Sequence, residues 1–186
     1  MGKFDVSEKQ NETIMAYYYE SSVSGTYDFY IGSVNDVVYA NPNSRYVFAY
    51  MTNLVSINGM ENFDTSNVTN MGYMFAYCNS LTTIDVSHFN TLKVLSMGGM
   101  FNDCSSLTIL DLSNFDTSKA EYMTNIFSNC NKLNTLNISN FSFERIKETD
   151  KIYVFSGVSK SCDVIVGSKE AKEWIKNNFD IDARIQ

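Results

Sequence analysis

The sequence predicts an α/β-type repeat solenoid: a leucine-rich-repeat-like, right-handed stack with a parallel β-sheet and short helical limbs. The first supporting observation is a 26-residue unit that occurs three times in succession, beginning at Phe63, Phe89 and Phe115. The second is an L-x-x-L-x-L pattern inside the units, which is typical of leucine-rich repeats. The third is an ordinary globular composition, with 44% hydrophobic and 19% charged residues, which excludes a disordered chain.

The repeat keeps its register over columns of equivalent positions, most of them apolar, and partial copies flank it at both ends. One unit cannot bury its apolar side chains alone, so each coil must pack against its neighbours. We expect the phenylalanine column to form a continuous stacked spine. The apolar columns are Phe63/Phe89/Phe115/Phe141, Met71/Met97/Met123, Met74/Met100/Ile126, Phe75/Phe101/Phe127, Cys78/Cys104/Cys130, Leu81/Leu107/Leu133, Ile84/Leu110/Leu136 and Val86/Leu112/Ile138.

Within the first unit, residues 84–87 alternate between apolar and polar side chains, which is the period of a half-buried strand. In a stack of coils such strands lie side by side in a parallel sheet, about 4.8 Å apart. The limb that precedes the strand has apolar side chains at the spacing of one or two helical turns, partly 3₁₀. Its positions in the first unit are Val68, Met71, Met74, Phe75 and Cys78.

The segments Asp64-Thr65-Ser66 and Asp116-Thr117-Ser118 precede these limbs and have the composition of Asx turns or helix N-caps. The two ends of the chain differ from the repeat. We expect an N-terminal β cap over residues 1–44, the solenoid over residues 45–150 and a C-terminal cap over residues 151–186. Strands of the caps are expected near residues 13–17, 27–31, 37–40, 152–155 and 163–166.

A closing amphipathic helix is predicted to begin at Ser168. Glu170 lies in its first turn, where a carboxylate is favourable, and Trp174, Ile175 and Phe179 share one side. Such a helix would cover the last coil, whose apolar side would otherwise be exposed.

The cysteine column invites two functional interpretations, a disulfide and a zinc site. Stacked positions lie within the Cα distance that a disulfide accepts, but their Cβ vectors are parallel rather than convergent. No CxxC pair or second histidine accompanies the cysteines as in a zinc site. We therefore expect Cys78, Cys104 and Cys130 to be buried free thiols, and Cys162, outside the column, to be unpaired.

Composition excludes several functions. The formal net charge is −7 and the sequence pI is near 4.6, so a nucleic-acid partner is not expected. No apolar run is long enough to cross a bilayer, so we expect no direct membrane insertion. The single histidine, His88, replaces asparagine in the sister units and is expected at a surface corner. Because no metal set, catalytic triad or cofactor loop stands apart from the repeat, we predict a protein without enzymatic activity and without a cofactor.

The candidate ligand-facing surface is the outward side of the predicted strands. The Asp85/Asp111/Asn137 column on it allows two functional interpretations, an acidic ligand surface or a weak calcium site. The structural interpretation is a solvated polar ladder that keeps the sheet soluble. Calcium is the weaker of the functional alternatives, because no EF-hand or RTX-type spacing is present. The candidate residues are Thr83, Asp85, Ser87, Ile109, Asp111, Ser113, Thr135, Asn137 and Ser139.

The phrase FDTSNVTNMGYMFAYCNSLTTIDVS, at residues 63–87, resembles the repeat of the BspA-like leucine-rich-repeat family of bacterial surface proteins. The opening segment and the terminal VIVGSKEAKEWIKNNF are similar to the caps of that family. The resemblance implies a module of a secreted or wall-attached bacterial protein, associated with adhesion and without enzymatic activity. Since the sequence has no signal peptide or anchor, we expect the chain to be an excised module.

Two functions remain open. The first is a protein-binding module for adhesion or surface recognition, whose protein or surface ligand the sequence does not identify. The second is a structural spacer or display scaffold with no ligand of its own. In both cases we expect a monomer.

Overall fold

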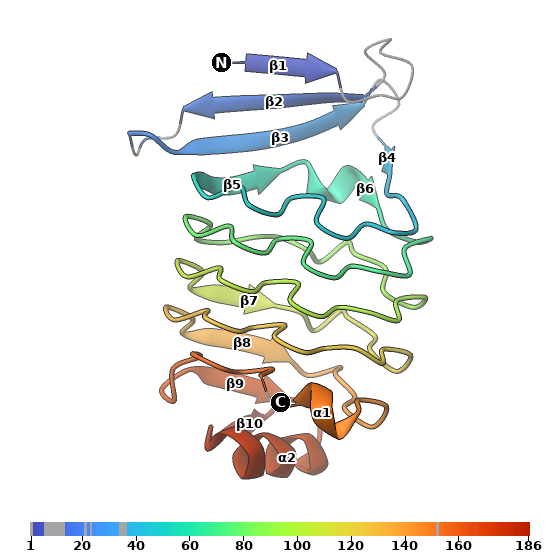
Figure 1. The fold of residues 1–186 in the computed structure, drawn as a ribbon, viewed down its shortest axis with the longest axis vertical. Coiled ribbons are helices and arrows are strands. Elements are labelled where there is room, and N and C mark those ends of the chain that lie inside the picture. The colour runs from blue at the N-terminus through green and yellow to red at the C-terminus, as the bar shows by residue number, and fades with distance from the viewer. Residues whose placement is uncertain (1, 6–13, 21, 23, 34–36, 152) are drawn as a thin grey trace.

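In a computed structural model, the chain forms a solenoid of about five coils whose strands lie in parallel ladders (Figure 1). The structure describes residues 2–5, 14–20, 22, 24–33, 37–151 and 153–186. The predicted repeat solenoid is therefore confirmed. The coils follow one another along the longest axis, between a β cap at the N-terminal end and a helix at the C-terminal end.

The N-terminal cap is a sheet in the order β1-β2-β3-β5. Strands β1 (Gly2–Asp5), β2 (Ile14–Glu20) and β3 (Tyr27–Ser33) pair antiparallel. Strand β3 then pairs parallel with β5 (Leu54–Asn58), which belongs to the first coil. The cap thus continues into the solenoid through backbone hydrogen bonds. Strands β2 and β3 fall on the predicted segments, although residue 13 lies outside the described residues.

A second, smaller ladder runs along another side of the stack. Strand β4 (Val38–Tyr39) pairs parallel with β6 (Phe63–Asp64), which follows the 3₁₀ turn η1 (Met60–Asn62). Further along, single parallel bridges join Asn43 to Asn70 and Ser96 to Tyr122, with Asn70 and Ser96 also bridged. The predicted cap strand near residues 37–40 therefore pairs with a coil rather than with the cap sheet.

The predicted parallel sheet is confirmed for the later coils. Strands β7 (Ile109–Asp111), β8 (Thr135–Ile138), β9 (Asp163–Val166) and β10 (Arg184–Ile185) lie side by side and all pair parallel. The equivalent residues 81–86 of the first unit are not assigned as a strand. Backbone hydrogen bonds still join this segment to both neighbouring coils, because Thr82 N donates to Val55 O and Thr82 O accepts from Thr108 N.

The predicted helical limbs are wrong. Residues 71–77 form linked turns, in which i→i+3 bonds such as Ala76 N to Tyr73 O alternate with bonds to the next coil. Tyr73 and Tyr77 adopt positive φ angles of 55° and 62°. A left-handed residue every fourth position stops a right-handed helix from propagating, yet it keeps the apolar spacing that resembles one.

Two phenylalanine stacks run through the core. One is the predicted column from Phe63 to Phe115, with ring centroids 6.1 Å apart for Phe63–Phe89 and 6.2 Å for Phe89–Phe115. The predicted spine does not continue to its fourth member, because the ring of Phe141 contacts those of Phe127 and Phe143 instead. The other comes from the turn limbs and joins the rings of Phe48, Phe75, Phe101, Phe127 and Phe155 in succession. These rings are almost entirely buried, so each coil depends on its neighbours for most of its core.

Two helices lie near the C-terminal end of the described part of the chain. Helix α2 (Lys169–Phe179) begins as predicted after Ser168, whose Oγ accepts a hydrogen bond from Ala171 N at 3.1 Å. Its Ile175 is fully buried against the last coil. The short helix α1 (Glu148–Lys151) was not predicted. The predicted strand at residues 152–155 is wrong, because residues 153–155 lie in turns; residue 152 is outside the described residues.

Candidate functional site

The predicted ligand face lies on the outer side of the strands. The pairing of β7 with β8 places Ile109 beside Thr135 and Asp111 beside Asn137. Exposure decreases toward the C-terminal end, where β9 adds a neighbour on the far side of β8. In chain order, Thr83, Asp85, Ser87, Ile109 and Asp111 are exposed, whereas Ser113, Thr135, Asn137 and Ser139 are half-buried.

The carboxylates of this face have a structural role at the corner after each strand. Asp85 Oδ1 accepts a hydrogen bond from Ser87 N at 2.9 Å, and Asp111 Oδ1 accepts one from Ser113 N at the same distance. The hydrogen bonds from Ser87 lower the pKa of Asp85. Asn137 makes the equivalent contact through its amide oxygen. Among the described residues, no group of three or more His, Cys, Asp or Glu is placed to hold a metal ion.

The turns that precede the limbs contain the same hydrogen bond, from a backbone N–H to the carboxylate two residues earlier. Asp64 Oδ1 and Asp116 Oδ1 each accept a hydrogen bond from the serine N–H two residues later, at 2.8 Å. The prediction of Asx turns at these positions is confirmed. The buried threonine that follows each of them was not predicted. Thr65 and Thr117 bond to the backbone of the next coil, and their signal was the invariant threonine three places into each unit.

The cysteine column consists of buried free thiols, as predicted. Cys104 Sγ donates to Phe75 O at 3.2 Å, and Cys130 Sγ donates to Phe101 O at the same distance. Burial raises the pKa of Cys78 to about 12 and that of Cys130 to about 12. The raised pKa keeps these thiols protonated at neutral pH, which disfavours nucleophilic reaction.

A second surface, which was not predicted, lies on the turn limbs of the first two coils, where its first-coil members are exposed and its second-coil members are half-buried. It consists of Tyr46, Tyr50, Tyr73 and Tyr77, here called the tyrosine cluster. The ring centroids of Tyr46 and Tyr73 are 5.1 Å apart, and those of Tyr50 and Tyr77 are 4.8 Å apart. The signal in the sequence was a pair of tyrosines four residues apart in each of two successive coils.

Arg45 covers part of the tyrosine cluster. Its guanidinium carbon lies 4.7 Å from the ring centroid of Tyr46 and 5.2 Å from that of Tyr73. Its Nη2 donates a hydrogen bond to the hydroxyl of Tyr46 at 3.0 Å. On the far side of Tyr73 lies Gly99, where an added β-carbon would overlap the tyrosine ring. The cluster is thus held between a cation and a glycine.

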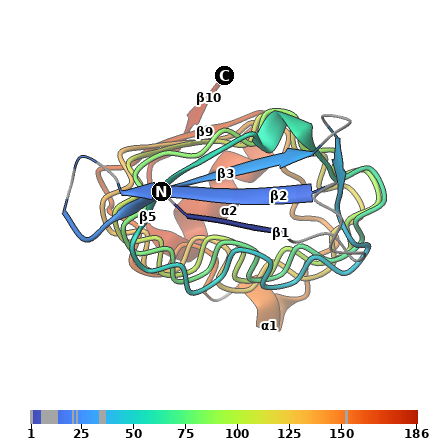
Figure 2. The same cartoon turned by 90° about the horizontal axis from the view of Figure 1, so that it is seen from above.

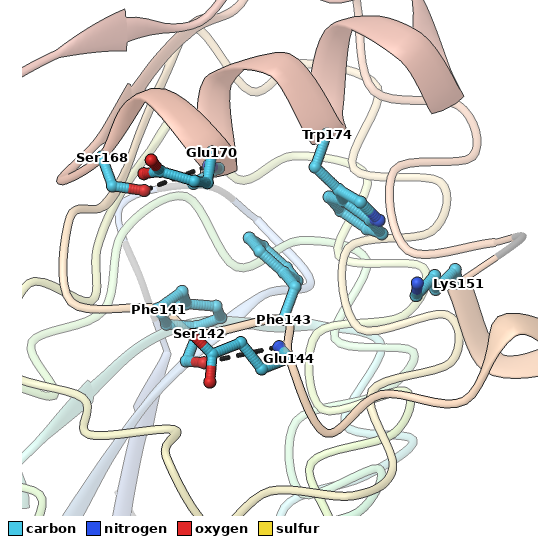
Figure 3. A pocket seen from close by; sticks show the side chains of 9 residues that line it. Phe141, Ser142, Phe143, Glu144, Lys151, Ser168, Glu170 and Trp174 are labelled. Atoms are coloured by element: carbon cyan, nitrogen blue, oxygen red, sulfur yellow. Dashed lines mark hydrogen bonds between the residues drawn. The ribbon is translucent and has the colours of Figure 1, made fainter.

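The C-terminal cap contains a pocket of about 340 Å³ between helix α2 and the segment that follows β8 (Figure 3). The rings of Phe143 and Trp174 stack with centroids 4.2 Å apart and form one wall. Glu144 and Glu170 lie on opposite sides of the opening, and their carboxylates do not converge (Figure 3). Within the described residues, the buried indole N–H of Trp174 has no hydrogen-bond partner.

The stacked coils, shared core and capped ends define a repeat-solenoid protein. A family model described as "Mycoplasma protein of unknown function, DUF285" matches residues 43–165, which is more than half of the chain. The chain therefore belongs to this family. No curated protein and no solved structure matches the sequence. None of the helices in the described part of the chain has the length and apolar character needed to span a membrane.

Proposed function

We propose that this chain is a non-catalytic protein-binding module of a bacterial cell-surface protein, used for adhesion or surface recognition. Membership of the DUF285 family supports the repeat architecture. The finer resemblance to BspA-like leucine-rich-repeat proteins, carried by residues 62–87 and 114–139, supports an extracellular or cell-wall-associated location and a role in adhesion.

The observation that carries the proposal is the exposed face of the strand ladder around Ile109. This side chain is 55% exposed on β7, between the buried Leu107 and Leu110. The solenoid core does not use it, because the inward positions of the same strand already complete the packing. Its column contains threonine in the two sister units, so this outward position changes between polar and apolar residues, whereas the inward positions stay apolar. Repeat proteins bind partners on such extended faces.

The absence of catalysis is part of the proposal. The thiols have pKa values too high for nucleophilic chemistry at neutral pH. One oxygen of each carboxylate on the candidate face accepts a backbone hydrogen bond at a turn, which is a structural role. We propose a monomer that needs no cofactor, and its mass can be checked by light scattering.

The test compares two lysine substitutions of equally exposed apolar residues. Ile109→Lys changes the strand face, whereas Leu92→Lys changes a residue that is 54% exposed outside that face. Both variants should keep the melting temperature of the parent protein, since neither side chain is in the core. The probe is an immobilised extract of host extracellular matrix and mucosa, and binding is followed by surface plasmon resonance.

We expect Ile109→Lys to weaken binding by about tenfold or more, as truncation of a central contact does, and Leu92→Lys to leave binding unchanged. Equal binding by both variants would reject the strand face. If the parent protein binds neither this extract nor bacterial surfaces, the chain acts as a spacer or display scaffold.

A further inference from the structure

The tyrosine cluster occupies backbone positions that are unfavourable for tyrosine. The φ angles are 65° at Tyr46, 65° at Tyr50, 55° at Tyr73 and 62° at Tyr77. A positive φ is strained for residues with a bulky side chain, and such strain persists where the surrounding structure or a function maintains it. The later coils fill the same positions with residues that tolerate this region: Gly99, Asp103, Asn125 and Asn129. The turn limb itself therefore does not require tyrosine.

Packing explains the cluster in part only. The stacks Tyr46–Tyr73 and Tyr50–Tyr77 offset some of the strain. The side chains of Tyr46 and Tyr50 nevertheless remain 41% and 63% exposed, and the core beneath them is completed by the phenylalanine stack that includes Phe48. Exposed tyrosine together with arginine is the composition of residues that dominate protein interfaces.

The geometry of the rings restricts the kind of ligand. A sugar ring binds an aromatic side chain by lying on an open ring face. Here Tyr73 has Tyr46 on one side and Gly99 on the other, and Tyr46 has Arg45 over its ring. Tyr50 stacks on Tyr77 and lies 6.4 Å from the ring centroid of Tyr46. Both ring faces of Tyr73 are thus occupied, and each of the other rings has at least one face covered by a stacked neighbour, which favours a polypeptide over a glycan.

The charge of the cluster restricts the ligand further. Arg45 already occupies the cation position over Tyr46 and Tyr73, so a lysine or arginine of a partner would be repelled there. One of its N–H groups bonds to the Tyr46 hydroxyl, and the planar guanidinium has further donors that suit a carboxylate. Within a chain of net charge −7, Arg45 is thus a local positive group that favours an anionic partner.

We propose that the tyrosine cluster and Arg45 form a docking surface for an acidic peptide segment of a partner protein. A carboxylate of the partner binds the Arg45 guanidinium, and its apolar side chains pack against the tyrosine ring edges. This surface lies on the turn limbs, which run along one long side of the solenoid, whereas β9 and β10 run along the opposite side (Figure 2). It is therefore separate from the strand face.

The test is a selection with a phage-displayed library of random peptides on the parent chain. Counter-selection uses the double variant Tyr46→Asn/Tyr50→Asn, in which asparagine takes the residue type of Asn125 and Asn129 in a later coil and so keeps the backbone conformation. The matched control is Tyr39→Asn, which replaces a tyrosine that is 73% exposed outside the cluster. Peptides enriched on the parent and on Tyr39→Asn, but not on the double variant, should carry an excess of aspartate and glutamate.

Fluorescence anisotropy of the enriched peptides then gives affinities. Arg45→Gln should weaken binding by about tenfold or more and remove the preference for glutamate over glutamine in the peptide. Because Arg45 is exposed, this variant should have the melting temperature of the parent chain. It therefore tests the proposal even if the double variant is destabilised. Ile109→Lys should leave the affinities of these peptides unchanged. Binding at the tyrosine cluster can therefore fail or succeed independently of binding at the strand face.

Three results would overturn the proposal. The first is a selection that yields no peptides, or lysine-rich and arginine-rich ones. The second is binding on a glycan array that the double variant loses, which would assign the surface to carbohydrate. The third is concentration-dependent dimerisation of the parent chain that Tyr46→Asn/Tyr50→Asn abolishes, which would assign the surface to a second copy.

Discussion

Thr65 and Asn90 are joined by two hydrogen bonds between successive coils. The Thr65 hydroxyl donates to Asn90 O at 3.1 Å and accepts from Asn90 N at 2.8 Å. Thr117 repeats both contacts with Ser142. One buried side chain thus satisfies a backbone donor and a backbone acceptor at a place where no strand ladder is available.

Replacing this threonine by its apolar isostere should destabilise the solenoid. In Thr117→Val, the N–H and the C=O of Ser142 lose their partner in a partly buried environment, and each unsatisfied group is costly. We expect a loss of about 1–3 kcal/mol in the free energy of unfolding, measured by urea denaturation. Thr83→Val, at an exposed position, is the control and should change the free energy by less than about 0.5 kcal/mol. Equal effects of the two substitutions would contradict this role.

Gly99→Ala should destabilise the protein more than Gly25→Ala, although both glycines have a positive φ. Gly99 has a φ of +64°, and the new methyl group would overlap the Tyr73 ring. Gly25 has a φ of +78°, but its β-carbon would meet nothing within 4 Å. Gly25→Ala should therefore cost about 1 kcal/mol from backbone strain alone, and Gly99→Ala clearly more. Adding Tyr73→Asn should remove the extra destabilisation of Gly99→Ala that comes from the overlap with the tyrosine ring. A double-mutant cycle of thermal unfolding measures this coupling.

The buried thiols should make the protein less stable at alkaline pH. Burial raises the pKa of Cys130 from about 9.0 to about 12, so the unfolded state loses its proton first. The stabilising effect of the neutral buried thiol is present below pH 9 and is lost as the pH rises through 9 toward 12. Cys130→Ala should reduce the slope of unfolding free energy against pH in this window. An unchanged slope would show that groups other than Cys130 cause the loss of stability at alkaline pH.

The same burial should protect the thiols from reagents. In the native protein at pH 8, Cys78, Cys104 and Cys130 should react with a thiol-specific reagent much more slowly than in urea-unfolded protein, because the thiolate is scarce and access is closed. Mass spectrometry after a timed labelling pulse measures the modified positions. Rapid native labelling of Cys104 would contradict the observed burial.

Substitutions at Asp111 can separate a structural role from calcium binding. Asp111→Asn keeps an oxygen acceptor for Ser113 N, as Asn137 does in the next unit, and should be nearly neutral. Asp111→Ala removes the acceptor and should cost about 0.5–1.5 kcal/mol in the free energy of unfolding. Calcium should not raise the melting temperature of the parent protein. A calcium-dependent increase that Asp111→Asn abolishes would favour the metal-site interpretation.

The sequence was most informative where a column of side chains faces inward. The phenylalanine, methionine and cysteine columns predicted the core and its free thiols, because burial of equivalent residues in successive coils is forced by the repeat. The helix after Ser168 was predicted from its cap and its apolar side. The limbs were misassigned because a left-handed residue every fourth position, such as Tyr73 and Tyr77, leaves the same apolar spacing as a helix.

The candidate surfaces were harder to predict. Alternation correctly indicated that Thr83, Asp85 and Ile109 point outward, but it did not reveal that the carboxylate of Asp85 caps a turn. The tyrosine cluster depends on contacts between coils and on backbone conformation. A single unit read along the chain contains neither, so Tyr46 and Tyr73 were not recognised as neighbours.

The contacts between coils also bear on how such a chain changes its length. Backbone bonds such as Tyr73 N to Gly98 O and Gly99 N to Thr124 O recur with the period of the unit. Duplication or loss of one whole unit would therefore recreate the same junction. An extra residue in the first coil is absorbed between two limbs, because Tyr46 and Tyr73 are 27 residues apart whereas Tyr73 and Gly99 are 26 apart, and all three keep a positive φ. Such a chain should therefore lengthen or shorten most readily by whole units, with small insertions confined to the segments between the limbs.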